Sequence, residues 1–340
     1  MGDNMEYKEE DNMLEQNDLD QNELDQNKFE QDEDINEDTV IAMSGKSILV
    51  KCGLYLSFMS LAIFAAQFII SFIVASLFPD ADETGWFNVV LTLITVVGVG
   101  LPIFARLMKG IPDSEIGEKK NISIIKFIGY FIICVATAYI SNIVGLFISA
   151  IIELIKGIEM INPLEEFIFG SNMIIFALYA VIIAPIVEEL VFRKILLDKL
   201  RRFGDLPAIL ITGFAFGIFH FNLAQFFYAT VLGILFAYIT IRTNRIIYSI
   251  VLHMMMNFTG TAFVPLLTKD QNLLGMGIMM IWFYGAMTLG SILLIVSLRK
   301  IKLIKPITPL VRKRDYILNP GALLFIAIGI GMIIINIAMA

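Results

Sequence analysis

Titratable side chains inside apolar segments are the residues of this 340-residue sequence best suited to chemistry. Glu188 and Glu189 are adjacent within one apolar run, and the two histidines of the chain, His220 and His253, lie in two others. Such groups are costly at membrane depth, and a helix without need of them would carry apolar residues instead. The pattern predicts a polar cavity where a carboxylate and imidazoles move protons.

Helical spacing predicts different surroundings for the two carboxylates. Glu189 and Arg193 are four residues apart and share a face. Glu188 points about 100° away from Glu189. Arg193 can therefore hold one carboxylate while the other meets a different environment. Pro185 removes a backbone hydrogen bond just before the pair and predicts a kink there.

The predicted depths of the polar groups agree. Counted at 1.5 Å per residue, Glu188 lies ~20 Å from Arg201, and His220 lies ~21 Å from Leu206. His253 and Asn257 lie roughly 12 and 18 Å deep. A lone histidine in an apolar helix more often serves as an interhelical hydrogen-bonding residue, and a lone Glu–Arg pair as an anchor. Because neither explanation accounts for the shared depth, a functional site is the preferred interpretation.

Composition predicts an all-α, polytopic membrane protein. Hydrophobic residues make up 57% of the chain, and the mean hydropathy is +0.78. Cys52 and Cys134 both lie in apolar runs, which disfavours a disulfide framework or a cysteine zinc site. Long apolar runs bounded by charge predict eight to nine membrane-spanning helices. The segments are approximately 53–78, 86–107, 125–152, 171–196, 206–222, 226–241, 246–265, 273–297 and 321–339.

Charge is distributed unevenly along the chain. The first forty residues hold 16 of the 32 acidic and two of the 25 basic residues, so the remainder carries a net charge of +7. A pentad repeat without helical or strand periodicity predicts a disordered acidic tail over 1–42. The predicted membrane parts are an N-terminal group of helices (47–160), a catalytic core (171–265) and C-terminal helices (270–340).

Basic clusters follow every even-numbered apolar segment. Because basic loops face the cytoplasm, this predicts an integral cell-membrane protein with a cytoplasmic N-terminus and an external C-terminus. The ninth segment is glycine-rich and lies beyond a long basic loop, which makes it the weakest of the predicted spans.

Three short motifs occur in order on successive predicted helices. Residues 188–193 read EExxxR, 216–220 read FxxxH, and 253–257 read HxxxN. Together they resemble the CPBP family, which comprises the type II CAAX prenyl endopeptidases and the bacteriocin-processing (Abi) proteins. The resemblance covers about residues 171–265. It implies an eight-helix intramembrane protease with a cavity open to the cytoplasm, to which the ninth segment would be an addition.

The resemblance also implies six catalytic residues: Glu188, Glu189, Arg193, His220, His253 and Asn257. Glu188 would act as the general base that activates a water molecule. Asn257 would stabilise the tetrahedral oxyanion, and Glu189 with Arg193 would orient the site. A buried carboxylate and an amide donor are suited to these roles.

The two histidines could act with or without a metal. As ligands, His220, His253 and Glu188 would suit Zn²⁺ with an open position for water, and Glu189 would then become the base. Without a metal, the same groups would polarise the water directly. The implied partners are the lipid bilayer and a peptide or membrane-protein substrate, with a prenylated CAAX tail suggested by the family, and no nucleic acid. The oligomeric state is left open.

A non-enzymatic membrane protein is the second interpretation, either a proton-coupled transporter or a bacteriocin-immunity protein. Proton relays also use intramembrane glutamate and histidine. Transporters, however, are commonly built from repeated halves with broken helices, and the sequence has no such internal symmetry. The endopeptidase hypothesis is therefore preferred.

Overall fold

The computed structural model describes residues 45–78, 86–114, 117–157, 173–268, 272–305 and 311–339, and every regular element in these ranges is helical. Eight of the helices are long and apolar enough to cross a membrane: Gly45–Leu77, Phe87–Met108, Ile124–Lys156, Ile175–Phe203, Leu223–Thr243, Ile246–Thr268, Leu273–Leu298 and Pro320–Ala338. The predicted all-α, polytopic class is confirmed. The acidic tail predicted over 1–42 lies outside the described residues.

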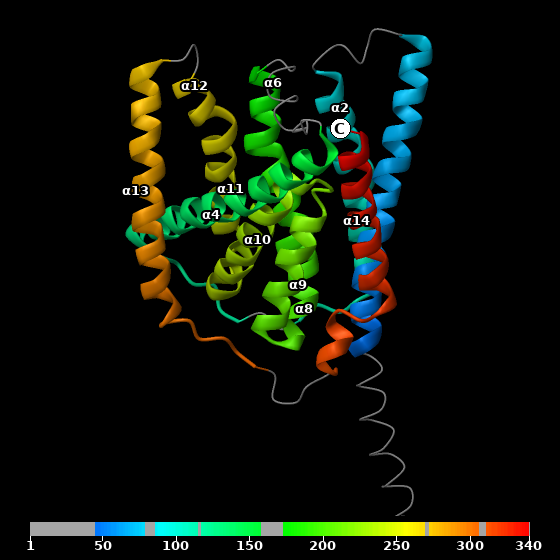
Figure 1. The fold of residues 1–340 in the computed structure, drawn as a ribbon. Helices are drawn as coiled ribbons and strands as arrows, with labels where there is room; N and C mark the ends of the chain where they lie inside the picture. Colours follow the sequence, from blue (N-terminus) through cyan, green and yellow to red (C-terminus); the bar gives the residue numbers. More distant parts are fainter. Residues whose placement is uncertain are drawn as a thin grey trace, which may run out of the picture. The chain divides into compact units, whose positions relative to one another are not determined.

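Three of these spans are built from consecutive helical segments (Figure 1). The second contains α2 (Phe87–Leu93), η1 (Ile94–Gly100) and α3 (Leu101–Met108). The fourth contains α6 (Met173–Leu178), η2 (Tyr179–Ile183), α7 (Ala184–Glu189), η3 (Leu190–Leu196), α8 (Leu197–Leu200) and η4 (Arg201–Phe203). The sixth contains α11 (Ile246–Phe258), η5 (Thr259–Phe263) and α12 (Val264–Thr268). The other labelled spans are α4 (Ile124–Lys156), α10 (Leu223–Thr243), α13 (Leu273–Leu298) and α14 (Pro320–Met339).

The fifth predicted segment, 206–222, is shorter than expected. It forms α9 (Asp205–Ile218), a helix of 14 residues, or ~21 Å in length. That falls short of the ~30 Å of a bilayer's hydrocarbon core. The chain turns after Ile218 and returns as α10, which packs against α9 along its length. The predicted helical position of His220 is wrong, because that residue lies in the turn between the two helices.

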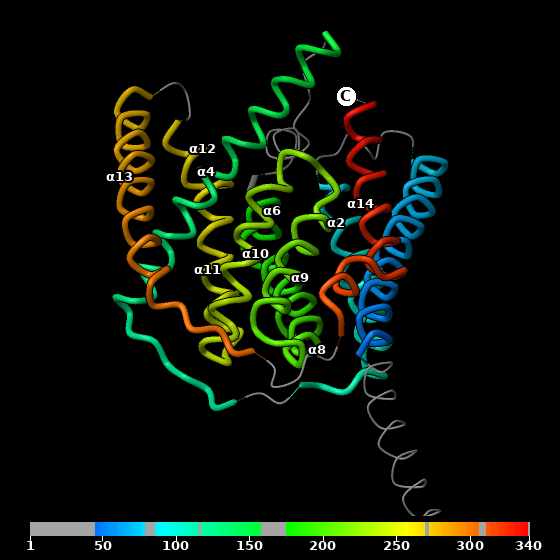
Figure 2. The backbone as a smooth tube through the Cα atoms, turned by 60° about the horizontal axis from the view of Figure 1, so that its bottom comes forward, coloured from blue at the N-terminus to red at the C-terminus, as the bar shows by residue number. Residues whose placement is uncertain are grey.

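Glycine allows α9 and α10 to approach closely. A Cβ atom added to Gly233 of α10 would lie 2.9 Å from the Cα atom of Gly213 of α9. Real Cβ atoms do not come this close to backbone atoms, so the contact requires glycine. Helix α10 also packs against α4, and α4 packs against α13. In both views, α13 and α14 lie on opposite sides of α8–α11 (Figures 1 and 2).

The loops after the even-numbered predicted segments meet at one end of the helices. Their contacts are Lys199 Nζ to Asp113 Oδ1 at 2.7 Å, Arg201 to Asn244 at 2.8 Å, and Arg242 to the Lys302 carbonyl at 3.3 Å. The basic clusters therefore lie on one side, as a positive-inside arrangement requires. That this side faces the cytoplasm stays a prediction.

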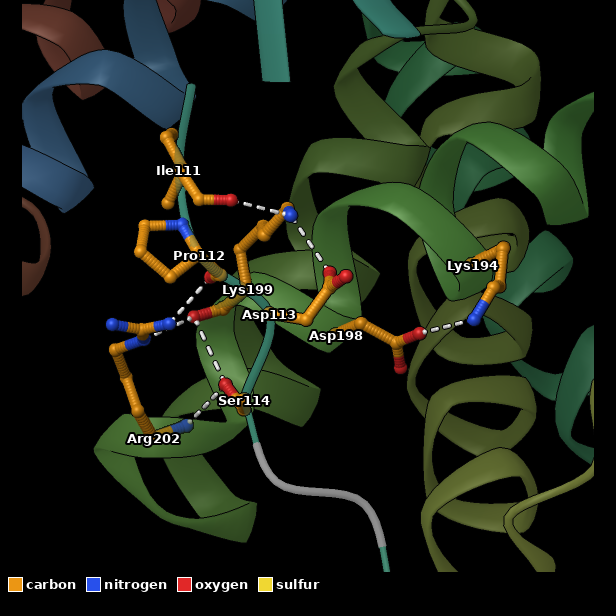
Figure 3. A network of polar contacts seen from close by, with 8 residues as sticks. All are labelled: Ile111, Pro112, Asp113, Ser114, Lys194, Asp198, Lys199 and Arg202. Carbon is orange, nitrogen blue, oxygen red and sulfur yellow. Dashed lines mark hydrogen bonds and ion pairs between the residues drawn. The ribbon is translucent and has the colours of Figure 1, made fainter. Parts of the chain in front are cut away.

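The segment after α3 is fastened to the end of the fourth span (Figure 3). The Lys199 ammonium donates to the Ile111 carbonyl at 2.5 Å and to the Asp113 carboxylate at 2.7 Å. The Ser114 N–H donates to the Asp198 carbonyl at 3.0 Å. These contacts fix the end of the span that carries the paired glutamates, and so limit how far that span can shift.

Candidate active site

A buried triad of charged and polar groups lies at the centre of the site. Glu189 and Arg193 are both fully buried, and Arg193 Nε lies 3.2 Å from Glu189 Oε2. His253, on α11, places its Nδ1 3.1 Å from the other carboxylate oxygen, Oε1. An ionised carboxylate only accepts hydrogen bonds, so His253 donates through Nδ1, and the neutral form of the ring then has a lone pair on Nε2. The i,i+4 pairing expected from the sequence is present.

Arg193 is surrounded by aromatic rings as well as by its carboxylate. The centre of its guanidinium lies 4.4 Å from the ring of Phe216 and 5.4 Å from that of Phe236. One terminal nitrogen donates to the carbonyl of Gly233 at 3.3 Å. A planar guanidinium can stack on rings and pair with a carboxylate at the same time, which an ammonium cannot. Arg193 therefore anchors Glu189 against α9 and α10.

Glu188 occupies a different environment from its neighbour. Its side chain is 21% exposed, and its Oε2 lies 3.6 Å from Nε2 of His253. That oxygen has no hydrogen-bond partner among the described residues. Tyr179 and Tyr228 are close enough to interact electrostatically with the carboxylate. Glu188 is thus the carboxylate that remains available for chemistry, while Glu189 is committed to structure.

His220 faces the same group of residues from the turn after α9. Its Nδ1 lies 2.8 Å from the Phe216 carbonyl. Because a carbonyl only accepts, Nδ1 carries the hydrogen and Nε2 is the free nitrogen. Glu188 and His253 are near enough to interact electrostatically with this ring. Phe216 lies edge-on to both imidazoles, with ring centres 4.9 and 5.6 Å away, and so fixes their spacing.

The turn that carries His220 is held in an unusual backbone conformation. The next residue, Phe221, has a φ of 53°, a left-handed value that is rare for a bulky side chain. Its carbonyl accepts a hydrogen bond from the Asn336 amide of α14 at 2.8 Å. Asn222 caps α10 by accepting from the Gln225 N–H at 2.8 Å. Strain of this kind persists where the surrounding contacts impose it.

Asn257 lies one turn beyond His253 and is hydrogen-bonded to the fourth span. Its amide donates to the Ala180 carbonyl at 2.7 Å. Ala180 belongs to the π-helical η2, in which the Ala184 N–H bonds to the Tyr179 carbonyl five residues earlier. The next bond in that register would come from residue 185, a proline without an N–H. The Asn257 amide therefore donates to the Ala180 carbonyl, for which Pro185 provides no N–H.

The residues expected to bind a metal do not form a ligand set in this arrangement. Among the described residues, no three His, Cys, Asp or Glu side chains are placed so that they could hold one metal ion. Catalytic zinc requires three protein ligands, and the available groups, Glu188, His220 and His253, do not fit it as they stand. The Zn²⁺ expected from the sequence stays a prediction.

Sequence reasoning missed three polar residues near the site. Tyr179 and Tyr228 lie near Glu188, and Asn336 anchors the His220 turn. Asn336 could have been found, because an amide inside the otherwise apolar run 321–339 is costly without a partner. The two tyrosines resemble other interfacial aromatics in the sequence and gave no comparable signal.

Comparisons with known proteins agree with the three motifs. Residues 170–259 match the family model described as type II CAAX prenyl endopeptidase Rce1-like. Over 77 residues, the chain is 40% identical to a Bacillus subtilis (strain 168) protein named "Putative membrane peptidase YdiL". The match covers 22% of this chain and 32% of that relative, so the chain aligns with about a third of the relative's length. No solved structure matches. The resemblance seen in the sequence is confirmed.

Proposed function

We propose that this protein, whose residues 170–259 match the type II CAAX prenyl endopeptidase model, is an intramembrane endopeptidase that uses a water molecule activated by Glu188. The observation that carries the proposal is the contact between Glu188 Oε2 and His253 Nε2, 3.6 Å apart. The carboxylate oxygen is an acceptor, and in the neutral imidazole that donates to Glu189 through Nδ1, the Nε2 atom is an acceptor too. Two facing acceptors need a donor that serves both.

A water molecule meets that requirement. It can direct one hydrogen to Glu188 and the other to His253, which leaves its oxygen lone pairs facing the substrate. As the oxygen attacks the peptide carbonyl carbon, Glu188 accepts the proton and acts as the general base. The nitrogen–carbon bond then breaks, and the proton passes to the leaving amine. The hydroxyl group of the water ends on the new carboxyl group, and its other hydrogen ends on the released amine.

The remaining residues orient the reacting groups and stabilise the charge that develops on them. Glu189 fixes the orientation and tautomer of His253, and Arg193 neutralises Glu189. His220 uses Nδ1 for its contact with the Phe216 carbonyl and lies near enough to Glu188 to interact electrostatically, so it can assist proton transfer. The Asn257 amide has two hydrogens, of which one bonds to Ala180. The other is available to a developing oxyanion.

The proposed substrate is a peptide segment held at the membrane, and a prenylated C-terminal tail follows from the family's description. This can be tested by incubating the full chain in liposomes with two peptides of identical sequence, one prenylated and one not. We expect cleavage of the prenylated peptide. Equal cleavage of both peptides would support the peptidase activity but exclude a requirement for the prenyl group.

The function itself is tested with Glu188→Gln, which keeps the shape of the side chain and removes the base. We expect cleavage to fall by about 10²- to 10⁴-fold. Glu118→Gln is the matched control, because it makes the same change at an exposed position beyond α3 and should leave the rate unchanged. A Glu188→Gln protein that cleaves at the full rate would exclude this mechanism.

Metal assistance and transport are tested in the same liposomes. Loss of cleavage with a chelator, restored by Zn²⁺, would favour the metal-assisted form of the reaction. If candidate peptides remain intact while solute flux depends on pH, the alternative of a proton-coupled transporter would replace the endopeptidase.

A further inference from the structure

An apolar cavity of about 380 Å³ lies apart from the candidate active site. It is lined by residues of the Gly45–Leu77 helix, η3, α8, α9, α10 and α14, and by the segment just before α14. None of the six predicted catalytic residues lines it. Its volume falls within the ~300–1,000 Å³ of ligand pockets. The side chains that face it are almost all aliphatic or aromatic.

The packing of α14 explains why the cavity exists. Near its start, α14 touches the first span so closely, through Gly321 and Gly53, that a Cβ atom on either would clash with the other helix's backbone. Further along, Gly329 is in close contact with Ile218 at the end of α9. Gly321 and Gly329 are separated by ~12 Å along α14. Between them, Ala322 and Phe325 line the cavity.

The cavity borders the lipid-facing surface. Leu210 and Phe214 of α9 line it, yet they are 46% and 41% exposed. Protein interiors contain few voids larger than a water molecule, and this one has about twelve times the ~30 Å³ of a liquid water. Water does not fill an apolar cavity readily. Lipid tails are as apolar as leucine side chains and are the occupants available in the bilayer.

One end of the cavity is bordered by positive charge. Tyr316 lines the cavity and ends η7 (Lys313–Tyr316), a 3₁₀ turn. Residues three apart in a 3₁₀ helix are eclipsed, so Lys313 lies on the same face as Tyr316. Arg312 and Arg314 flank Lys313, and both contact the buried carboxylate of Asp315. Three consecutive cationic side chains and one carboxylate give this end of the cavity a net positive charge. A positive charge there would attract an anionic lipid headgroup.

We propose that this cavity binds one acyl chain of an anionic phospholipid, with the headgroup against Lys313. The acyl chain replaces the missing contacts among α9, α14 and the first span, and the phosphate meets the basic turn. Leu196 and Leu200 of the span that carries Glu188 also line the cavity. The bound chain therefore packs behind the helix of the candidate active site.

The direct test is native mass spectrometry of the full chain. The protein is extracted from liposomes that contain equal amounts of phosphatidylglycerol and phosphatidylcholine with identical acyl chains. We expect one retained phospholipid per chain, predominantly phosphatidylglycerol. Retention of both lipids in equal amounts, or of none, would overturn the proposal.

Two substitutions separate the chain site from the headgroup site. Ala322→Phe fills the cavity and should abolish retention, whereas Ile330→Phe adds a comparable ring on the lipid-exposed side of α14 and should not. Lys313→Ala should keep the lipid but lower the preference for phosphatidylglycerol about fivefold, which corresponds to about 1 kcal/mol per basic residue. Unchanged retention in the Ala322→Phe protein would contradict the assignment.

A photoreactive phospholipid provides a measurement that needs no variant. A diazirine near the end of its acyl chain should label the lining residues Leu210 and Phe214, and unlabelled phosphatidylglycerol should compete. Labelling displaced by farnesol but not by phosphatidylglycerol would assign the cavity to an isoprenoid and overturn the phospholipid. Labelling confined to the outer face of α13 would also overturn the assignment of a phospholipid to this cavity. None of these measurements depends on peptide cleavage. A negative result for lipid binding can therefore be distinguished from a negative result for the proposed peptidase.

Discussion

The side-chain amide of Asn257 donates a hydrogen bond of 2.7 Å to the backbone carbonyl of Ala180. That carbonyl lacks its π-helical donor because residue 185 is a proline. A break in the backbone pattern of one span is thus satisfied by a motif residue of another. In a membrane interior, an unpaired carbonyl would otherwise cost several kcal/mol. The contact ties α11 to the fourth span one turn beyond His253.

This relationship predicts non-additive effects of Asn257→Ala and Pro185→Ala. The asparagine change alone should lower the free energy of unfolding by about 1–3 kcal/mol, because it leaves the Ala180 carbonyl unpaired. Pro185→Ala restores an N–H that can reach Ala180, so the same asparagine change should cost less in that background. A double-mutant cycle on unfolding in detergent measures the coupling. Strictly additive losses would mean that the two residues do not share this acceptor.

Arg193 should tolerate no substitution that leaves the Glu189 carboxylate charged without the buried guanidinium beside it. Breaking a buried ion pair by removing one partner costs about 3–5 kcal/mol, so Arg193→Met should lower the thermal midpoint strongly. Replacing both partners, in Glu189→Gln with Arg193→Met, should recover part of that loss. The midpoints of the parent and of these two variants, measured in one detergent, check this. A double variant less stable than Arg193→Met would contradict the pairing.

The anchor between α14 and the His220 turn should affect the rate more than the fold. Asn336→Leu removes the donor to the Phe221 carbonyl and lets the turn relax. A misplacement of about 1 Å can cost ~10²-fold in rate, and we expect a fall in kcat with little change in KM. Ile335→Leu, at a lipid-exposed position of the same helix, is the matched control. A change in KM alone would argue that Asn336 acts on substrate binding.

The contacts of Lys199 predict a local loosening at the basic end of the molecule. Lys199→Met removes the donor to the Ile111 carbonyl as well as the partner of Asp113. Asp113→Asn removes only an exposed charge, and exposed ion pairs contribute about 0–1 kcal/mol. Hydrogen exchange over 109–114 should therefore rise clearly in the lysine variant and little in the aspartate variant. Equal effects would show that the ion pair, and not the carbonyl contact, holds the segment.

The sequence allowed the spans and the pairing of Glu189 with Arg193 to be predicted, because hydropathy and i,i+4 spacing are local properties. It could not predict that α9 ends at Ile218, since the apolar run continues through the turn that holds His220. That turn depends on the distant Asn336, and the Asn257 bond depends on the register of η2. Such contacts arise from packing between spans, which a local sequence pattern does not predict.

The comparison of Glu188→Gln with Glu189→Gln tests the division of roles between the two carboxylates most directly. Cleavage rate and thermal midpoint are measured for both variants in the same liposome preparation. We predict that Glu188→Gln loses cleavage by about 10²-fold or more while its midpoint stays close to that of the parent. Glu189→Gln should instead lower the midpoint, because it weakens the buried contacts with Arg193 and His253. A Glu188→Gln protein that cleaves at the parent rate, beside a stable and inactive Glu189→Gln protein, would contradict the account.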